Sequence, residues 1–379
     1  MSTKLVVLTE IISPYRIPVF NCLARIEGID LHVIFLAEND PETRSWLVYK
    51  NEIQFSYEVL HSYRVNCGRY KLLFNRGVCN VLSRTAPDVI VCGGYNYVAS
   101  WQSLSWARRN GIPFLLWSES HARDRRRNNR FIERLKTHFI RRCSAFIVPG
   151  KAASHYLTAF HIARERIFVA PNAVDNDLFG QIARGVREQA AIERLQLGLP
   201  QRFFIFVGRL VIEKGVFDLL SAYRRLDPGI ACTVGLVFVG DGPARTELEK
   251  AARDIAAGSI QFRGFVQREM LARYYALSDA LVLPTHTDTW GLVVNEAMAC
   301  GLPVVCADVA GCAADLIKEG WNGRVIRAND INQLTCVLEE LITQRQSLAA
   351  MGENSRKRIL DYSPEACAEG IATAALWRN

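Results

Sequence analysis

Two basic residues near the middle of the chain stand where a parallel sheet would present them to an anion. Arg209 follows the apolar run FFIFVG, and Lys214 comes five residues later, where a helix-like stretch begins. Cations at the carboxyl end of a buried strand are costly unless an anion binds there. Arginine can bind a phosphate bidentately and lysine can bind it as a point charge. The sequence therefore predicts a diphosphate site here, and the alternative is a solvated basic surface.

A second phosphate-directed feature lies in the stretch 284–305, PTHTDTWGLVVNEAMACGLPVV. It reads as a polar loop, then Gly291, then an apolar helix that begins with Leu292 and Val293. The first N–H groups of a helix have no partner inside the helix, and the helix dipole is positive at that end. Such a corner binds phosphate, so we expect Gly291, Leu292 and Val293 to hold the same diphosphate.

Two carboxylates accompany this corner, Asp288 before the helix and Glu296 within it. Glu296 could accept hydrogen bonds from the vicinal hydroxyls of a ribose. Asp288, on the flexible side of Gly291, could reach a sugar hydroxyl or a reacting centre. The alternative for each is an ordinary surface carboxylate.

The two stretches resemble the signature of family 4 glycosyltransferases, nucleotide-sugar enzymes with two Rossmann-like domains (GT-B). The matching residues are G-R-L-V-I-E-K-G at 208–215 and W-G-L-V-V-N-E-A-M-A at 290–299. The resemblance implies that Arg209 and Lys214 bind the donor diphosphate and that backbone at Phe265 and Val266 holds the base. Asp288 replaces the first Glu of the family motif, so its contact must approach more closely or pass through water.

The strand pattern supports the same fold class. Short apolar, β-branched runs recur along the chain, each followed by turn residues and a helix-like stretch. Continuous apolar runs are typical of parallel strands covered on both faces, and 379 residues exceed the usual size of one core. We expect two doubly wound α/β domains, 1–171 and 172–362. By resemblance, they face each other across a cleft, and a helix at 363–379 crosses back onto the first domain.

The N-terminal half carries candidate residues for the sugar and the acceptor. His121 and Glu119 follow the strand-like run PFLLW, and the resemblance places a catalytic-site His or acid in this loop, facing the donor sugar. With His121 we count Lys214 and Asp288 as the candidate catalytic residues. A neutral imidazole could hydrogen-bond a sugar hydroxyl or stabilise charge at the anomeric carbon.

Two further loops in this half suit the acceptor side. Tyr15 and Arg16 lie in IISPYRIPVF, after the first apolar run, and Gly94 and Tyr95 follow DVIVC. We place these four residues and Glu119 on the acceptor side. The alternative is that both are ordinary loops of the fold.

The formal net charge of +8 is concentrated in one segment, 123–142, which has nine Lys or Arg and two acidic residues. A helical apolar stripe accompanies the charge, made by Phe131, Ile132, Leu135, Phe139 and Ile140. Such a helix could lie on an anionic membrane surface, or it could pack on the sheet with its charge solvated. Nucleic acid is not expected, because no nucleic-acid module accompanies the patch.

The cysteines, the N-terminus and the hydropathy bound the remaining possibilities. The eleven cysteines form no CxxC pair and lie mostly in apolar runs, so we expect reduced thiols and no metal site. No signal-peptide pattern or long apolar span is present. We therefore expect a cytoplasmic protein, and the alternative is a peripheral position on the cytoplasmic face of the membrane.

These observations predict a glycosyltransferase, and the resemblance implies that it transfers the sugar with retention of configuration. It would move a hexosyl-type sugar from a UDP- or GDP-sugar to a saccharide or lipid-linked acceptor in polysaccharide or glycolipid assembly. Arg209 and Lys214 would neutralise the leaving group, so neither a metal nor another cofactor is expected. Two alternatives are a nucleotide-sugar epimerase or a phosphorylase on the same fold, and a non-catalytic basic protein that binds lipid or nucleic acid.

Overall fold

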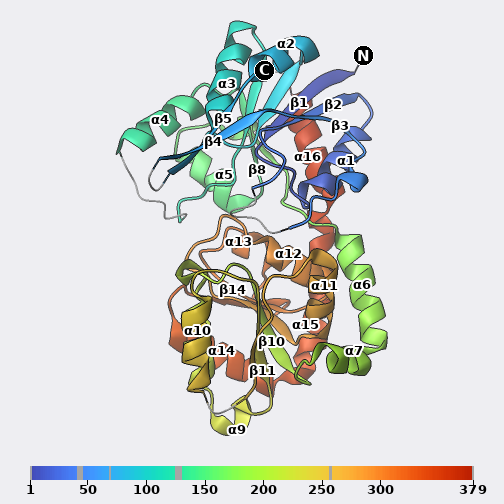
Figure 1. Cartoon of the computed structure of the whole chain (residues 1–379), viewed down its shortest axis with the longest axis vertical. Helices are drawn as coiled ribbons and strands as arrows, with labels where there is room; N and C mark the ends of the chain where they lie inside the picture. Colours follow the sequence, from blue (N-terminus) through green and yellow to red (C-terminus); the bar gives the residue numbers. More distant parts are fainter. Residues whose placement is uncertain (1, 41–45, 68–69, 124–129, 256–257, 378–379) are drawn as a thin grey trace. The chain divides into compact units, whose positions relative to one another are not determined.

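The computed structural model describes residues 2–40, 46–67, 70–123, 130–255 and 258–377. The chain forms two compact units, Met1–Ala173 with Pro364–Asn379, and Val174–Ser363. Figure 1 shows both, with the C-terminal helix α16 lying among the elements of the first unit. The domain limits expected from the sequence, 171/172 and 362/363, lie within two residues of these borders.

The first unit is built on a seven-stranded parallel sheet in the order β3-β2-β1-β6-β7-β8-β9. Successive strands are added on one side of β1 and then, from β6 onward, on the other, so the order reverses between β1 and β6. The strands are β1 (Thr3–Thr9), β2 (Ile29–Phe35), β3 (Ser56–Val59), β6 (Val89–Cys92), β7 (Phe114–Trp117), β8 (Ala145–Val148) and β9 (Ile167–Val169).

Helices cover both faces of this sheet, which explains why its central strands β6, β7 and β8 are apolar and buried throughout. In β1, Leu5 and Val7 belong to one core, whereas Val6 and Leu8 belong to the other. The C-terminal helix α16 packs against α1 and β9. The helices are α1 (Arg16–Ala24), α2 (Val78–Thr85), α3 (Val98–Arg109), α4 (Arg130–Ile140), α5 (Lys151–Thr158) and α16 (Pro364–Leu376), with short 3₁₀ turns at Lys50–Glu52 and Arg164–Arg166.

A separate antiparallel hairpin, absent from the predicted elements, interrupts the first unit between β3 and α2. Its strands are β4 (Ser62–Cys67) and β5 (Tyr70–Asn75). Tyr63 pairs directly with Phe74, and both side chains are exposed, whereas Leu73 on the opposite face is buried.

The second unit has a six-stranded parallel sheet in the order β12-β11-β10-β13-β14-β15. The order reverses between β10 and β13, so the loops after these two strands flank the crevice where doubly wound sheets bind ligands. The strands are β10 (Phe203–Val207), β11 (Gly235–Val239), β12 (Ile260–Phe262), β13 (Ala280–Leu283), β14 (Val304–Ala307) and β15 (Gly323–Ile326).

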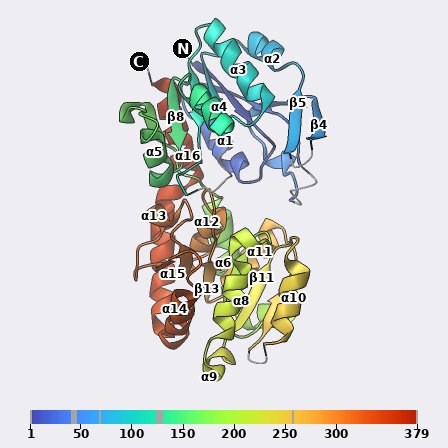
Figure 2. The same cartoon turned by 90° about the vertical axis from the view of Figure 1, so that its left-hand side faces the viewer.

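Two groups of helices cover the faces of this sheet. Helix α8 packs with α10 and α14, whereas α6 packs with α11 and α12; Figure 2 shows α8 beside α10. The helices are α6 (Asn176–Glu188), α7 (Ala190–Leu197), α8 (Val216–Arg224), α9 (Pro228–Ala231), α10 (Arg245–Arg253), α11 (Arg268–Leu277), α12 (Leu292–Ala299), α13 (Ala313–Leu316), α14 (Ile331–Thr343) and α15 (Arg345–Ile359), with 3₁₀ turns at Ile212–Lys214 and Leu360–Tyr362.

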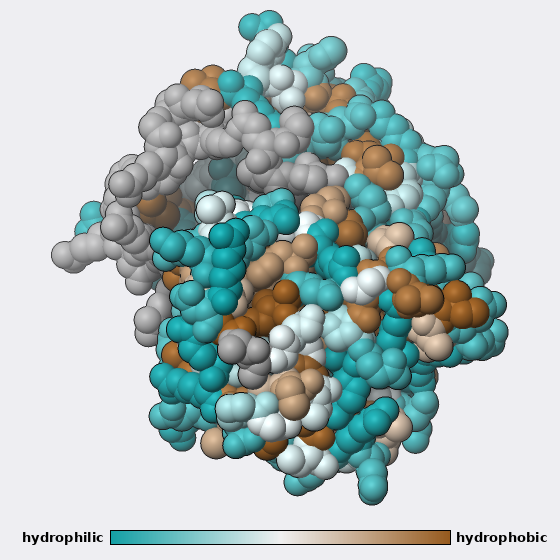
Figure 3. Space-filling view, turned by 60° about the horizontal axis from the view of Figure 1, so that its bottom comes forward, coloured by the Kyte–Doolittle hydropathy of each residue, from teal (hydrophilic) through white to brown (hydrophobic). Residues whose placement is uncertain are grey.

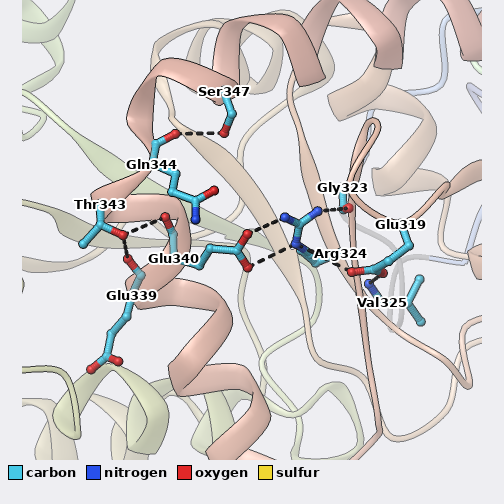
Figure 4. A network of polar contacts seen from close by, with 9 residues as sticks. All are labelled: Glu319, Gly323, Arg324, Val325, Glu339, Glu340, Thr343, Gln344 and Ser347. Atoms are coloured by element: carbon cyan, nitrogen blue, oxygen red, sulfur yellow. Dashed lines mark hydrogen bonds and ion pairs between the residues drawn. The ribbon is translucent and has the colours of Figure 1, made fainter.

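Arg324 ties the edge strand β15 to helix α14 (Figure 4). Its guanidinium forms an ion pair with Glu340, and its Nε lies 3.6 Å from Oε1 of Glu319. The other oxygen of Glu319 accepts a hydrogen bond from the N–H of Val325 at 2.8 Å. Arg324 lowers the pKa of the Glu340 carboxyl because it stabilises the charged form. The network anchors the outermost strand of the sheet.

The surface and the cysteines complete the description. On the face shown in Figure 3, hydrophilic side chains dominate and apolar ones form separate patches. The ten cysteines other than Cys67 are free thiols, six of them buried, although Cys232 and Cys336 are exposed. Burial raises the pKa of the Cys92 and Cys367 thiols to about 12, which keeps them protonated.

Among the described helices, none has the length and apolar character needed to span a bilayer.

Candidate functional site

Loops from five strands meet at the carboxyl edge of the second sheet. The N–H of Leu210 donates to the carbonyl of Asp241 at 2.9 Å, and the N–H of Gly240 donates to that of Gly264 at 2.7 Å. A Cβ on Gly240, whose φ is 132°, would lie 1.9 Å from the carbonyl oxygen of Gly208. Only glycine permits this approach. The predicted base-binding residues 265–266 follow Gly264 directly, and Phe265 is exposed.

The loops after β10 and β13 interlock across the point where the strand order reverses. The N–H of His286 donates to the carbonyl of Glu213 at 2.8 Å, and the hydroxyl of Thr285 donates to the same oxygen at 3.1 Å. A Cβ on Gly215, whose φ is 68°, would lie 2.0 Å from the carbonyl oxygen of Pro284. The two loops that carry the predicted diphosphate and sugar contacts are therefore in direct backbone contact.

The structure brings Lys214 and Asp288 together, a contact that the sequence did not predict. Lys214 Nζ lies 2.5 Å from Oδ2 of Asp288, and the two side chains are 24% and 15% exposed. Arg209 is exposed, and within the described residues it has no ion pair or side-chain hydrogen bond. The two predicted cations thus differ: Arg209 extends toward solvent, whereas Lys214 is neutralised by a carboxylate.

Helix α12 begins where the sequence predicts. Gly291 precedes it with φ 100°, no side chain caps it, and Leu292 and Val293 are half-buried at its first turn. The loop before the helix is held by the next crossover, because the N–H of Gly311 donates to the carbonyl of Asp288 at 3.1 Å. This contact fixes the backbone from which the Asp288 side chain projects.

Glu296 is fully buried, with 0% exposure, and one of its oxygens accepts a hydrogen bond from the hydroxyl of Tyr275 at 2.7 Å. The sequence did not identify Tyr275 as a partner. The expected contact between Glu296 and a ribose stays a prediction, and it would require this carboxylate to become accessible beside Tyr275.

Three of the predicted acceptor-side residues of the first unit meet at the carboxyl edge of its sheet. The Arg16 guanidinium forms an ion pair with Glu119 and lies 3.9 Å from the centre of the Trp117 ring. Tyr15 contacts Trp46 edge to face, with ring centres 6.0 Å apart. These residues follow β1 and β7, which flank β6, so strand order explains why distant sequence segments converge.

The other predicted residues of this edge are more enclosed. His121 is 5% exposed, and its Nδ1 accepts a hydrogen bond from the N–H of Arg123 at 3.3 Å. An imidazole that accepts at Nδ1 carries its proton on Nε2. Gly94 has φ 117°, and the half-buried Tyr95 ring packs against Phe139, with centres 5.9 Å apart. The Tyr95 ring therefore contributes partly to the core.

A His–Asp contact near Lys214 was missed from the sequence. His286 Nε2 lies 2.7 Å from Oδ2 of Asp218, in the first turn of α8. His286 lies only two residues before Asp288, and this closeness in the sequence could have identified it as a candidate site residue.

No group of metal-ligating side chains occurs within the described part of the chain. Asp175 and Asp177 have Asp-x-Asp spacing. Asp175 serves a structural role, because it caps α6 by accepting a hydrogen bond from the N–H of Leu178 at 2.9 Å.

Comparison with known proteins agrees with this geometry. Residues 20–178 match the model of Glycosyltransferase Family 4, and residues 188–358 match that of Glycosyl transferases group 1. The chain is 31% identical to the sulfoquinovosyl transferase SQD2 of Arabidopsis thaliana over 61% of its own length and 45% of that protein. It is 30% identical to a D-inositol 3-phosphate glycosyltransferase of Mycolicibacterium smegmatis over 57% and 49%. The matches thus span about half of these relatives.

The fold has close counterparts among solved structures. Anabaena Alr3699/HepE, solved in complex with UDP and glucose, superimposes with a TM-score of 0.75 over 98% of both chains at 19% identity. At this identity the likeness establishes the fold. With two parallel sheets and family matches over most of the chain, the protein belongs to the family 4 glycosyltransferases of the GT-B fold.

Proposed function

We propose that the protein transfers a hexosyl-type sugar, with retention of configuration, from a UDP- or GDP-sugar to a saccharide or lipid-linked acceptor. The observation that carries this proposal is the convergence of Arg209, Lys214 and the start of α12 at the reversal point of one parallel sheet. Two cations and a helix N-terminus at such a crevice fit a diphosphate. The proposal places the product in polysaccharide or glycolipid assembly.

The mechanism assigns leaving-group stabilisation to these residues. As the bond between the anomeric carbon and the diphosphate lengthens, negative charge develops on the diphosphate. Arg209, Lys214 and the N–H groups of Leu292 and Val293 would neutralise it, and each lost contact of this kind typically costs about 2.7–4 kcal/mol. A diphosphate oxygen would take the proton of the incoming hydroxyl on the same face, which retains the configuration. Because side chains supply the positive charge, the proposed reaction needs no metal.

Nucleotide binding tests the proposal. UDP or GDP at a hundred times its dissociation constant is expected to raise the free energy of unfolding by about 2.7 kcal/mol, measured as a shift in thermal unfolding. A panel of UDP- and GDP-sugars, assayed in excess EDTA with saccharide and lipid-linked acceptors, then identifies the transferred sugar by product mass.

The alternatives give different results in the same assays. A non-catalytic basic protein would show no stabilisation by either nucleotide. An epimerase or a phosphorylase would alter the donor when no acceptor is present. Activity lost in EDTA and restored by magnesium would contradict metal independence.

We further propose that the enzyme works at the cytoplasmic face of an anionic membrane, using a basic surface formed by α3 and α4. This surface is lined by Arg108, Arg109, Arg134, Arg141 and Arg142. The predicted apolar stripe is divided: Phe139 and Ile140 are buried in the core, whereas Ile132 and Leu135 are 44% and 42% exposed. The Phe131 side chain and residues 124–129 lie outside the described residues. Exposed aliphatic side chains beside arginines suit an anionic bilayer.

Sedimentation with liposomes of graded anionic content checks this surface. The bound fraction is expected to rise with anionic lipid and to fall with salt, because the attraction is electrostatic. Replacing Arg141 or Arg142 with alanine is expected to weaken binding about fivefold, since each basic residue near the surface contributes about 1 kcal/mol. Arg253→Ala on α10 is the matched control. Binding that is independent of lipid charge and of salt would exclude the membrane role.

A further inference from the structure

A second polar contact joins the two loops that form the diphosphate site. The Nε2–H of His286, in the loop after β13, donates a hydrogen bond to Oδ2 of Asp218 at 2.7 Å. The two side chains are 24% and 21% exposed, so the contact lies at the surface of the site rather than in the core. On the same loop, two residues further on, Asp288 contacts Lys214.

Beside the contacts of Thr285 and His286 with the carbonyl of Glu213, two tethers between side chains hold the loop 284–291 to the segment after β10. Asp288 reaches Lys214, at the end of the 3₁₀ turn, and His286 reaches Asp218, one turn later in α8. A backbone hydrogen bond from His286 to Glu213 lies between them. Both tethers connect the β13 loop to the segment after β10.

The proposed function requires one tether to be released. A diphosphate that binds Lys214 competes with Asp288 for the same ammonium group, and Asp288 is then available to a sugar hydroxyl. When the Lys214 contact is lost, the loop has one tether fewer. In this ligand-bound state, the loop must still place Asp288 and the start of α12 against the donor. The contact between His286 and Asp218 involves neither group, so it can persist when the ligand is bound.

We infer that His286 and Asp218 are positioning residues that hold the donor loop while Lys214 changes partner from Asp288 to the diphosphate. The inference rests on the proposed function. The inference has a distinctive kinetic consequence, because the contact between His286 and Asp218 contributes most to loop stability when the donor is bound and Lys214 no longer contacts Asp288. It should therefore stabilise bound substrate and transition state equally, and such uniform binding affects KM and leaves kcat unchanged.

The test compares His286→Leu and His286→Gln with the wild type, using calorimetry with UDP and with GDP and steady-state kinetics with the sugar donor. His286→Leu is expected to raise the Kd of the nucleotide and the KM of the donor about tenfold, with kcat within twofold. His286→Gln keeps an N–H donor for Asp218 and is expected to recover most of the affinity. Asp218→Asn is expected to weaken binding in the same direction.

The control breaks an ion pair at the opposite ends of the same two strands. Arg202 Nε lies 2.7 Å from Oδ2 of Asp279, and both side chains are 14% exposed. These residues precede β10 and β13, so Asp279→Asn is expected to lower Tm and leave nucleotide affinity unchanged. The inference is overturned if His286→Leu binds nucleotide as the wild type does. It is also overturned if Tm and kcat decrease in this variant while Kd and KM stay unchanged. A wild-type protein that binds neither UDP nor GDP refutes the proposed function itself.

Discussion

Replacing Arg209 with alanine is expected to lower kcat with the sugar donor by about 10²- to 10³-fold, the usual cost of losing one preorganised contact to developing charge. Arg209 is exposed at the carboxyl edge of β10 and has no ion pair within the described residues. Its removal therefore takes away positive charge without disturbing a structural contact. The measurement is steady-state kinetics, together with calorimetry to follow nucleotide affinity.

Lys214→Ala is expected to be at least as damaging, for an additional reason. It removes a cation and its ion pair with Asp288, and the Asp288 carboxylate stays beside the diphosphate site. Nucleotide affinity should fall more than in Arg209→Ala because the remaining carboxylate repels the ligand. Arg253→Ala is the control, since this exposed residue ends α10, at the opposite edge of the sheet. If kcat and nucleotide affinity each fall by less than threefold in both variants, these residues do not bind the diphosphate.

The parallel sheets could be predicted because their physical cause is visible in single segments. Residues of β1 alternate between two buried cores, so the whole run must be apolar. The hairpin β4–β5 could not be recognised in this way. Its exposed residues Tyr63 and Phe74 are as apolar as its buried Leu73, and only the antiparallel register separates the two faces.

The site was predictable where a backbone feature carries the chemistry and less so where side chains meet. Gly291 marks the start of α12 in sequence and in structure. The contacts of Lys214 with Asp288 and of His286 with Asp218 join residues 74 and 68 positions apart. They form because β10 and β13 are neighbours in the sheet, and the sequence of neither loop indicates this strand order. The enclosure of Glu296 likewise depends on Tyr275, from a third element.

His121→Ala is expected to reduce turnover by about 10²-fold or more while nucleotide affinity stays near that of the wild type. His121 lies just after β7, at the same sheet edge as Arg16 and Glu119. With Nδ1 accepting from the N–H of Arg123, the ring carries its proton on Nε2. That N–H is the group we expect to hydrogen-bond a hydroxyl of the donor sugar, which would hold the anomeric carbon in the orientation needed for transfer.

Two variants separate this role from a structural one. His121→Asn places an amide oxygen where Nδ1 lies, so it can still accept from Arg123, but it lacks the Nε2–H group. We therefore expect it to fold like the wild type and to remain as slow as His121→Ala. His32→Ala is the matched control, since this partly buried histidine lies in the middle of β2 and contacts Ser56 at 2.8 Å, away from the carboxyl edge. Turnover restored in His121→Asn would show that His121 only holds its loop, and the sugar contact would then have to come from Glu119 or another residue of that edge.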